Sequence, residues 1–142
     1  MIMPRLAVLL FLTLPCVRIC TACSCAPSIP GQENLKTQAD FKASDIVFRG
    51  ELIAHRGGVA VFRVHEQWKG KLGSEVKLEW RRGDRGDCNG FWPDDLKVGN
   101  DLLVFARKGH DGVYQTSICL PTMLASAAQK LLGELGHGET NP

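Results

Sequence analysis

Apolar and polar residues alternate through the middle of the chain, which is typical of β-strands with one buried and one wet face. The alternation is strictest in residues 76–81, Val-Lys-Leu-Glu-Trp-Arg. The same period predicts one strand that starts at residue 45, with Gly50 as a place to bend or bulge, and another over residues 59–68. A turn at Arg56-Gly57-Gly58 would join these two strands. In the second of them the period places three side chains on one face: Phe62, Val64 and Trp68.

Two more strands and a helix are predicted after a loop at residues 82–99, which is rich in Gly and Asp. Residues 101–108 contain a continuous apolar run, so we expect a strand that is buried on both faces. Residues 114–118 give a fifth strand. Leu124, Ala128 and Leu131 recur at helical spacing, which predicts a helix over residues 122–132.

These elements predict one domain, residues 23–136, in a mainly β fold. Closure into a barrel is the usual way in which a few short strands avoid exposed sheet edges, so we expect a five-stranded Greek-key barrel of the OB type with a C-terminal helix. Residues 26–40 have neither strand nor helix periodicity and are expected to form a surface arm. Residues 137–142 are expected to be a disordered tail.

Residues 1–22 have the pattern of a secretory signal peptide, with Arg5 before an apolar run and small residues at Cys20-Thr21-Ala22. We therefore expect cleavage before Cys23 and a secreted protein, extracellular or periplasmic. The apolar run is about half of the roughly 20 residues that a membrane-spanning helix needs. We accordingly expect no transmembrane segment.

The expected mature chain is electrically balanced and contains an even number of cysteines. Loss of Arg5 and Arg18 leaves 15 basic against 15 acidic residues, which argues against a nucleic-acid partner. In an oxidising compartment the remaining cysteines predict two disulfides. Cys23 and Cys25 are separated by one residue and cannot easily bridge each other, so spacing alone leaves two pairings open: Cys23 with Cys88 and Cys25 with Cys119, or the crossed alternative.

The sequence that cleavage would expose, Cys23-Ser24-Cys25-Ala26-Pro27, resembles the start of the tissue inhibitors of metalloproteinases. Residues 41–50 and Trp68-Lys69-Gly70 are also similar to that family's first strand and to the end of its second. The resemblance implies a netrin-like OB-fold with bridges Cys23–Cys88 and Cys25–Cys119. The chain departs from the family in three ways: Lys42 replaces a cysteine of a third bridge, the arm before residue 41 is longer, and the cysteine-rich second domain has no counterpart.

The resemblance further implies an inhibitor of a zinc metalloendopeptidase. In the family the α-amino nitrogen and carbonyl oxygen of the first cysteine bind the protease's zinc, at the position that the attacking water would occupy. Cys23 would take that role here and Ser24 would enter the specificity pocket. The implied inhibitory ridge, which we call the predicted ridge, consists of Cys23, Ser24, Cys25, Ala26, Pro27, Asp87, Cys88 and Asn89. We expect a monomer that has no cofactor of its own.

Other interpretations make different predictions. A netrin-like module could bind an extracellular or envelope partner without inhibiting a protease, since fold does not fix function. Residues 20–23 weakly resemble a lipoprotein signal, and lipidation of Cys23 would block its amine and leave Cys88 without its predicted partner. The adhesion tripeptide Arg-Gly-Asp occurs at residues 82–84 and 85–87, a sequence that Gly- and Asp-rich loops often produce by chance.

Catalysis and a resident metal are not expected. No serine elbow is present, and the expected mature cysteines are oxidised, so a Ser/His/Asp or Cys/His nucleophile is not predicted. The four histidines have no metal-ligand spacing and are expected at the surface. The three tryptophans could form a stacking platform for oligonucleotides or sugars, but a role in core packing fits the neutral charge better. These residues are His55, His65, His110, His137, Trp68, Trp80 and Trp92.

Overall fold

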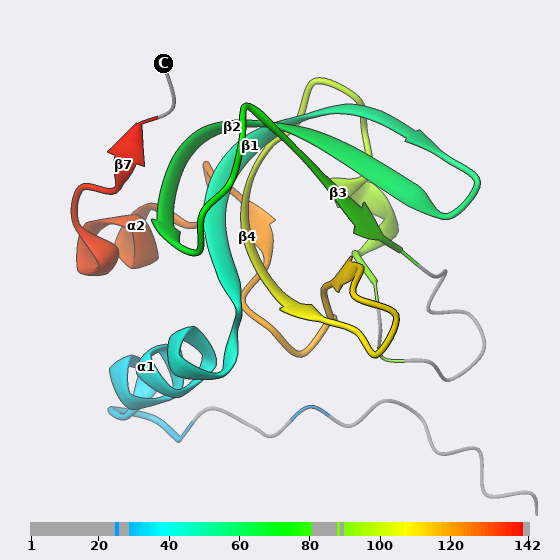
Figure 1. Ribbon diagram of the computed structural model, residues 1–142. Coiled ribbons are helices and arrows are strands. Elements are labelled where there is room, and N and C mark those ends of the chain that lie inside the picture. The colour runs from blue at the N-terminus through cyan, green and yellow to red at the C-terminus, as the bar shows by residue number, and fades with distance from the viewer. Residues whose placement is uncertain (1–24, 26–28, 81–87, 89, 141–142) are drawn as a thin grey trace, which may run out of the picture.

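Figure 1 shows a computed structural model of the chain, in which five strands close into a barrel. The structure describes residues 25, 29–80, 88 and 90–140. The barrel strands are β1 (Ile46–Arg56), β2 (Val59–Lys69), β3 (Glu75–Glu79), β4 (Asp101–Lys108) and β5 (Tyr114–Gln115).

The strands follow the order β1-β2-β3-β5-β4, and a further pairing of β1 with β4 closes the ring. β3 and β5 run parallel, while the other four contacts in the ring are antiparallel. This is the topology of an OB-type Greek-key barrel, so the predicted fold class is confirmed.

β1 closes the barrel because it pairs along both of its edges. Residues 46–51 pair with β4, and most of the strand also pairs with β2. The pairing with β2 shifts register at three places, one of them between Arg49 and Gly50. A Cβ atom on Gly50 would lie 2.5 Å from the carbonyl oxygen of Arg63, so the strands approach each other closely here. The bend that the sequence predicted at Gly50 is therefore confirmed.

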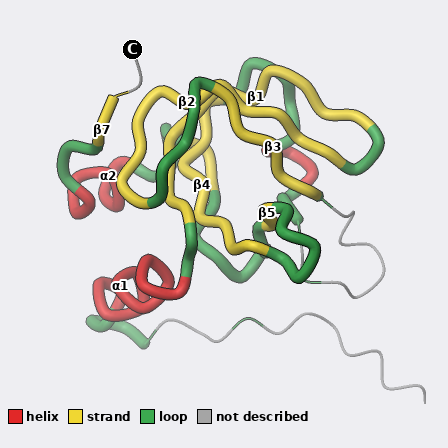
Figure 2. Tube along the Cα trace, viewed as in Figure 1, coloured by secondary structure: helices red, strands yellow, loops and turns green. Residues whose placement is uncertain are grey.

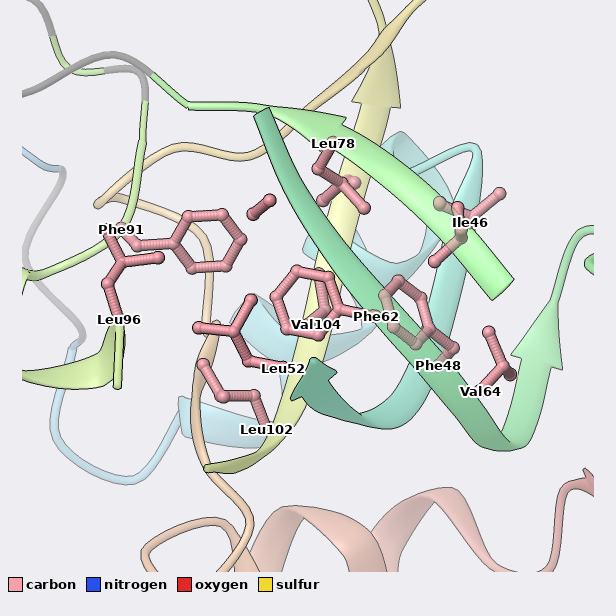
Figure 3. Packing of buried hydrophobic residues seen from close by; sticks show 13 residues of the cluster. Ile46, Phe48, Leu52, Phe62, Val64, Leu78, Phe91, Leu96, Leu102 and Val104 are labelled. Atoms are coloured by element: carbon pink, nitrogen blue, oxygen red, sulfur yellow. The ribbon is translucent and has the colours of Figure 1, made fainter. Parts of the chain in front are cut away.

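The larger of two apolar clusters fills the inside of the barrel (Figure 3). Phe62 lies at its centre, in edge contact with Phe48 at 5.6 Å between ring centroids and tilted against Phe91 at 5.7 Å. The buried position of Phe91 shows that this part of the loop before β4 packs onto the barrel. The interior side chains labelled in Figure 3 are Ile46, Phe48, Leu52, Phe62, Val64, Leu78, Phe91, Leu96, Leu102 and Val104.

The second cluster lies on the outer face of β1 and β4. Val47, Leu103 and Phe105 form its base, and residues of both helices, among them Phe41 and Leu131, pack against it. All residues of the apolar run 102–106 have 0% exposure, because alternate side chains enter the two clusters. The expectation of a strand buried on both faces is confirmed.

Trp68 does not share a face with Phe62 and Val64, so that prediction is wrong. In the β1–β2 ladder, Val47 pairs with Lys69 and Phe48 with Gln67, which leaves Trp68 as an extra residue. The bulge turns its ring out of the interior and onto the second cluster. There its Nε1 donates a hydrogen bond to the carbonyl oxygen of Gly136 at 2.8 Å.

The helices also differ from the sequence prediction. α1 (Glu33–Ala43) occupies much of the segment that was expected to be an irregular arm. Its residues are mostly polar and exposed, so no apolar period marked it. The expected helix at 122–132 begins later, as α2 (Gln129–Leu135), because Leu124 belongs to a short strand β6 (Met123–Leu124) that pairs with β4. A 3-10 turn, η2 (Pro93–Asp95), lies between β3 and β4.

Two short strands also replace expected features near the C-terminal end. The fifth strand stops at Gln115 and does not continue to residue 118. Within the expected tail, β7 (Glu139–Thr140) pairs with residues 66 and 67 of β2. Gly138 precedes it, and its backbone N–H donates to Glu66 Oε1 at 2.7 Å. Residues 137–140 are thus attached to the barrel.

Lys69 joins α1 to the barrel, and its loss is expected to lower stability. The ammonium group donates to the carbonyl oxygens of Phe41 and Lys42, both at 2.9 Å, at the helix end where the backbone dipole favours a cation. It also lies 5.4 Å from the centre of the Phe41 ring. We expect Lys69→Met to lower the free energy of unfolding in urea by about 1 to 2 kcal/mol. The matched change at exposed Lys71 should have little effect, and equal losses in the two variants would contradict this role.

Candidate functional site

Only two residues of the predicted ridge, Cys25 and Cys88, lie in the part of the chain that the structure describes. Cys23 and five other members of the predicted ridge lie outside it: Ser24, Ala26, Pro27, Asp87 and Asn89. The surroundings of Cys25 and Cys88 nevertheless show how these two cysteines attach to the barrel.

Cys25 forms a disulfide with Cys119, as predicted. The Cα atoms are 5.1 Å apart, and the bridge joins positions 94 residues apart in the sequence. The chain before α1 is therefore covalently attached to the segment that follows β5.

Cys88 lies beside that same segment. Its carbonyl oxygen accepts a hydrogen bond from the backbone N–H of Ile118 at 2.9 Å. Two residues further on, the N–H of Gly90 donates to the carbonyl oxygen of Thr116, also at 2.9 Å. Cys88 is disulfide-bonded as well. Because its predicted partner Cys23 is outside the described residues, the Cys23–Cys88 pairing stays a prediction.

Residues 116–122, which we call the arch, are thus the common attachment point for Cys25 and for Cys88. The arch leaves the barrel after β5 and returns to it just before β6. Hydrogen bonds to Ser117 shape it internally, from Cys119 N to the hydroxyl at 3.2 Å and from Leu120 N to the carbonyl at 2.9 Å. Leu120 is buried in the second cluster. The sequence predicted the bridge to Cys119 but gave no sign of the arch.

A groove of about 400 Å³ runs between the arch and α1. One wall is formed by Lys36 and Asp40, which make an ion pair at 2.6 Å. Arg107, at the end of β4, lines it as well, and the described residues give its exposed guanidinium no hydrogen bond or ion pair. Since Cys119 also lines the groove, a partner that contacts the bridge can place a carboxylate near Arg107.

The resolved pKa shifts lie away from this groove. Hydrogen bonds from the backbone N–H groups of Glu33 and Gly31 lower the pKa of Glu33. The side-chain hydrogen bond to Asp101 raises the pKa of Arg49. Burial, with a smaller contribution from Asp94, raises the pKa of Asp95. None of these groups lines the groove, whose charged side chains are those of Lys36, Asp40 and Arg107.

The described part of the chain contains no group of three or more His, Cys, Asp or Glu residues that could bind a metal ion. It also contains no helix that is both long and apolar enough to span a bilayer. All four histidines are exposed. One of them, His55, also makes an edge contact with the ring of Trp80, at 6.0 Å between ring centroids.

The tryptophans form no common stacking platform. Trp68 packs on the outer cluster and Trp80 against the inner one, in agreement with the expected role in packing. Trp92 differs from that expectation, because 55% of its surface is exposed. Both Arg-Gly-Asp tripeptides lie outside the described residues.

The fold and the Cys25–Cys119 bridge define a disulfide-bonded barrel of the OB type. No protein-family model matches the sequence, and no curated protein matches it.

Proposed function

We propose that the chain is exported and inhibits a zinc metalloendopeptidase in the manner of the tissue inhibitors of metalloproteinases. The α-amino nitrogen and the carbonyl oxygen of Cys23 would bind the zinc of the protease, and Ser24 would enter the pocket next to the metal. Catalytic zinc keeps one coordination position open for water or substrate and can expand to five ligands, so an inhibitor can displace the water and bind through two atoms. The chain itself would contribute no metal and catalyse no reaction.

One observation carries the proposal: the arch brings Cys25 and Cys88 together. Cys25 is bonded to Cys119, and Cys88 is hydrogen-bonded to the neighbouring Ile118. The predicted ridge requires these two segments, 63 residues apart in the sequence, to lie side by side. A ridge that is fixed at both segments before binding loses little conformational entropy in the complex, which favours affinity.

The groove beside the bridge supports the same orientation of a partner. A protease that covers Cys25 would also lie over Arg107, whose charge can select for an acidic residue at the rim of the active site. Zinc binding further requires a deprotonated amine. An α-amino group titrates near ~8, so the zinc must displace its proton at neutral pH.

Extension of the mature N-terminus by one alanine is expected to abolish most of the inhibition. The extra residue converts the α-amine of Cys23 into an amide and leaves all four mature cysteines in place. We expect the inhibition constant, measured against a panel of zinc endopeptidases, to rise about 100-fold or more, equal to ~2.8 kcal/mol. One alanine added after Pro142 provides the matched control and should leave inhibition unchanged.

Before that comparison, the mass and N-terminal sequence of the secreted protein must show a free Cys23. Undiminished inhibition by the extended protein would refute zinc binding through the amine. If the unmodified protein inhibits no protease in the panel and instead binds a non-protease partner, the inhibitor proposal fails and the binding-module interpretation replaces it.

A further inference from the structure

β4 has a gap in its hydrogen bonding beside the arch. On the side away from β1, residues 102–103 pair with β6 and residues 107–108 with β5. Phe105 lies between these two ladders, and both its N–H and its C=O point to this side. Backbone N–H and C=O groups without partners in such a buried position are costly, so something other than a strand must satisfy them.

Two threonine hydroxyls fill the gap. Phe105 N donates to Thr122 Oγ1 at 3.0 Å, and Thr116 Oγ1 donates to Phe105 O at 2.7 Å. The two hydroxyl oxygens are 3.0 Å apart. Both residues are buried, with exposures of 1% for Thr116 and 8% for Thr122.

Thr122 Oγ1 also lies 3.2 Å from the Phe105 carbonyl oxygen, but its contact to Thr116 Oγ1 is shorter, at 3.0 Å. With that shorter contact the protons can be assigned so that each is used once. The Phe105 N–H donates to Thr122, the Thr122 hydroxyl donates to Thr116, and the Thr116 hydroxyl donates to the Phe105 carbonyl. The three bonds form a closed ring in which each hydroxyl both donates and accepts. We call this ring the hydroxyl clamp.

The clamp closes the arch at its base, because Thr116 and Thr122 are its first and last residues. Cys119 lies midway between them and receives the bridge from Cys25. The position of this disulfide depends on the backbone on either side of it, and for Cys119 that backbone is the arch. We infer that Thr116 and Thr122 are positioning residues, whose hydroxyl clamp fixes the arch and thereby the Cys25 and Cys88 segments attached to it. Their consequence for inhibition rests on the proposed function, whereas their effect on the bridge does not.

The first test compares how fast the Cys25–Cys119 bridge is reduced in three variants of the secreted protein. Thr116→Val keeps the side-chain shape but removes the hydroxyl, Thr116→Ser keeps the hydroxyl, and Val64→Ala weakens the inner cluster away from the arch. Each protein is treated with dithiothreitol in native buffer, its free thiols are alkylated over time, and Cys119 is followed by mass spectrometry. We expect reduction about tenfold faster in Thr116→Val, the factor that corresponds to ~1.4 kcal/mol. Thr116→Ser and Val64→Ala should remain near the wild-type rate.

An unchanged rate in Thr116→Val would overturn the inference. Equal acceleration in Val64→Ala would also overturn it, since the hydroxyl would then contribute only to overall stability. If Thr116→Val is not secreted, amide hydrogen exchange of the wild-type protein decides. The Phe105 N–H should exchange as slowly as its neighbours in β4, and rapid exchange would show that the clamp does not form.

Inhibition gives a separate readout. If the wild-type protein inhibits a zinc endopeptidase, Thr116→Val should weaken inhibition while Thr116→Ser and Val64→Ala retain it. Equal inhibition by all three variants would refute the positioning role at the ridge. If the wild-type protein inhibits nothing, the proposed function fails, and the reduction rates still show whether the clamp fixes the bridge.

Discussion

Removal of the Cys25–Cys119 bridge is expected to lower the free energy of unfolding by about 3 to 5 kcal/mol. The bridge spans 94 residues, and a loop of that length gives the unfolded chain a large gain in entropy when it is opened. The double variant Cys25→Ala/Cys119→Ala removes the bridge without leaving a free thiol. Urea unfolding followed by tryptophan fluorescence measures the change.

The control is the wild-type protein after reduction and alkylation, which has no disulfides but keeps every residue of the sequence. The wild-type protein treated with a reductant and alkylated loses all its bridges, so it should be at least as unstable as the double variant. A loss below about 1 kcal/mol in the double variant would mean that contacts other than the bridge determine stability at the arch.

Phe62→Ala is expected to lower the free energy of unfolding by about 3 to 5 kcal/mol. Phe62 has 0% exposure and contacts the rings of Phe48 and Phe91, so its removal leaves a cavity at the centre of the barrel. The surrounding strands belong to a closed ring and cannot readily collapse into that space. Thermal and urea unfolding should both show the loss.

Val113→Ala provides the control for this change. Val113 is exposed at the turn before β5, and its truncation should alter stability by less than about 0.5 kcal/mol. A loss of under about 1 kcal/mol in Phe62→Ala would show that the interior repacks easily and that the ring contacts contribute little.

The sequence predicted those strands whose burial follows a simple period. β3 alternates between buried Val76 and Leu78 and exposed Lys77, and β4 is apolar throughout because two clusters share it. Trp68 was misplaced because a bulge changes which face a side chain occupies, and no residue type marks that bulge. α1 was missed because its exposed face is polar and only a few side chains, such as Phe41, reach the core.

For the candidate site, the sequence predicted the covalent bond but not its support. The resemblance implied the pairing of Cys25 with Cys119, which the structure confirms. Thr116 and Thr122 carried no signal, because their partners are the backbone N–H and C=O of Phe105, on another strand. A hydroxyl that replaces a missing strand can be recognised only once the strands on either side have been placed.

β7 determines how the protein can be attached to a surface. It pairs with the end of β2, and in Figure 2 it lies on the opposite side of the barrel from β5, the strand that leads into the arch. A biotin or a resin linker attached at β7 would therefore lie on the side of the barrel away from β5. Immobilised through β7, the protein would keep β5 and the groove lined by Gln115 turned to solution, which suits it to the capture of binding partners.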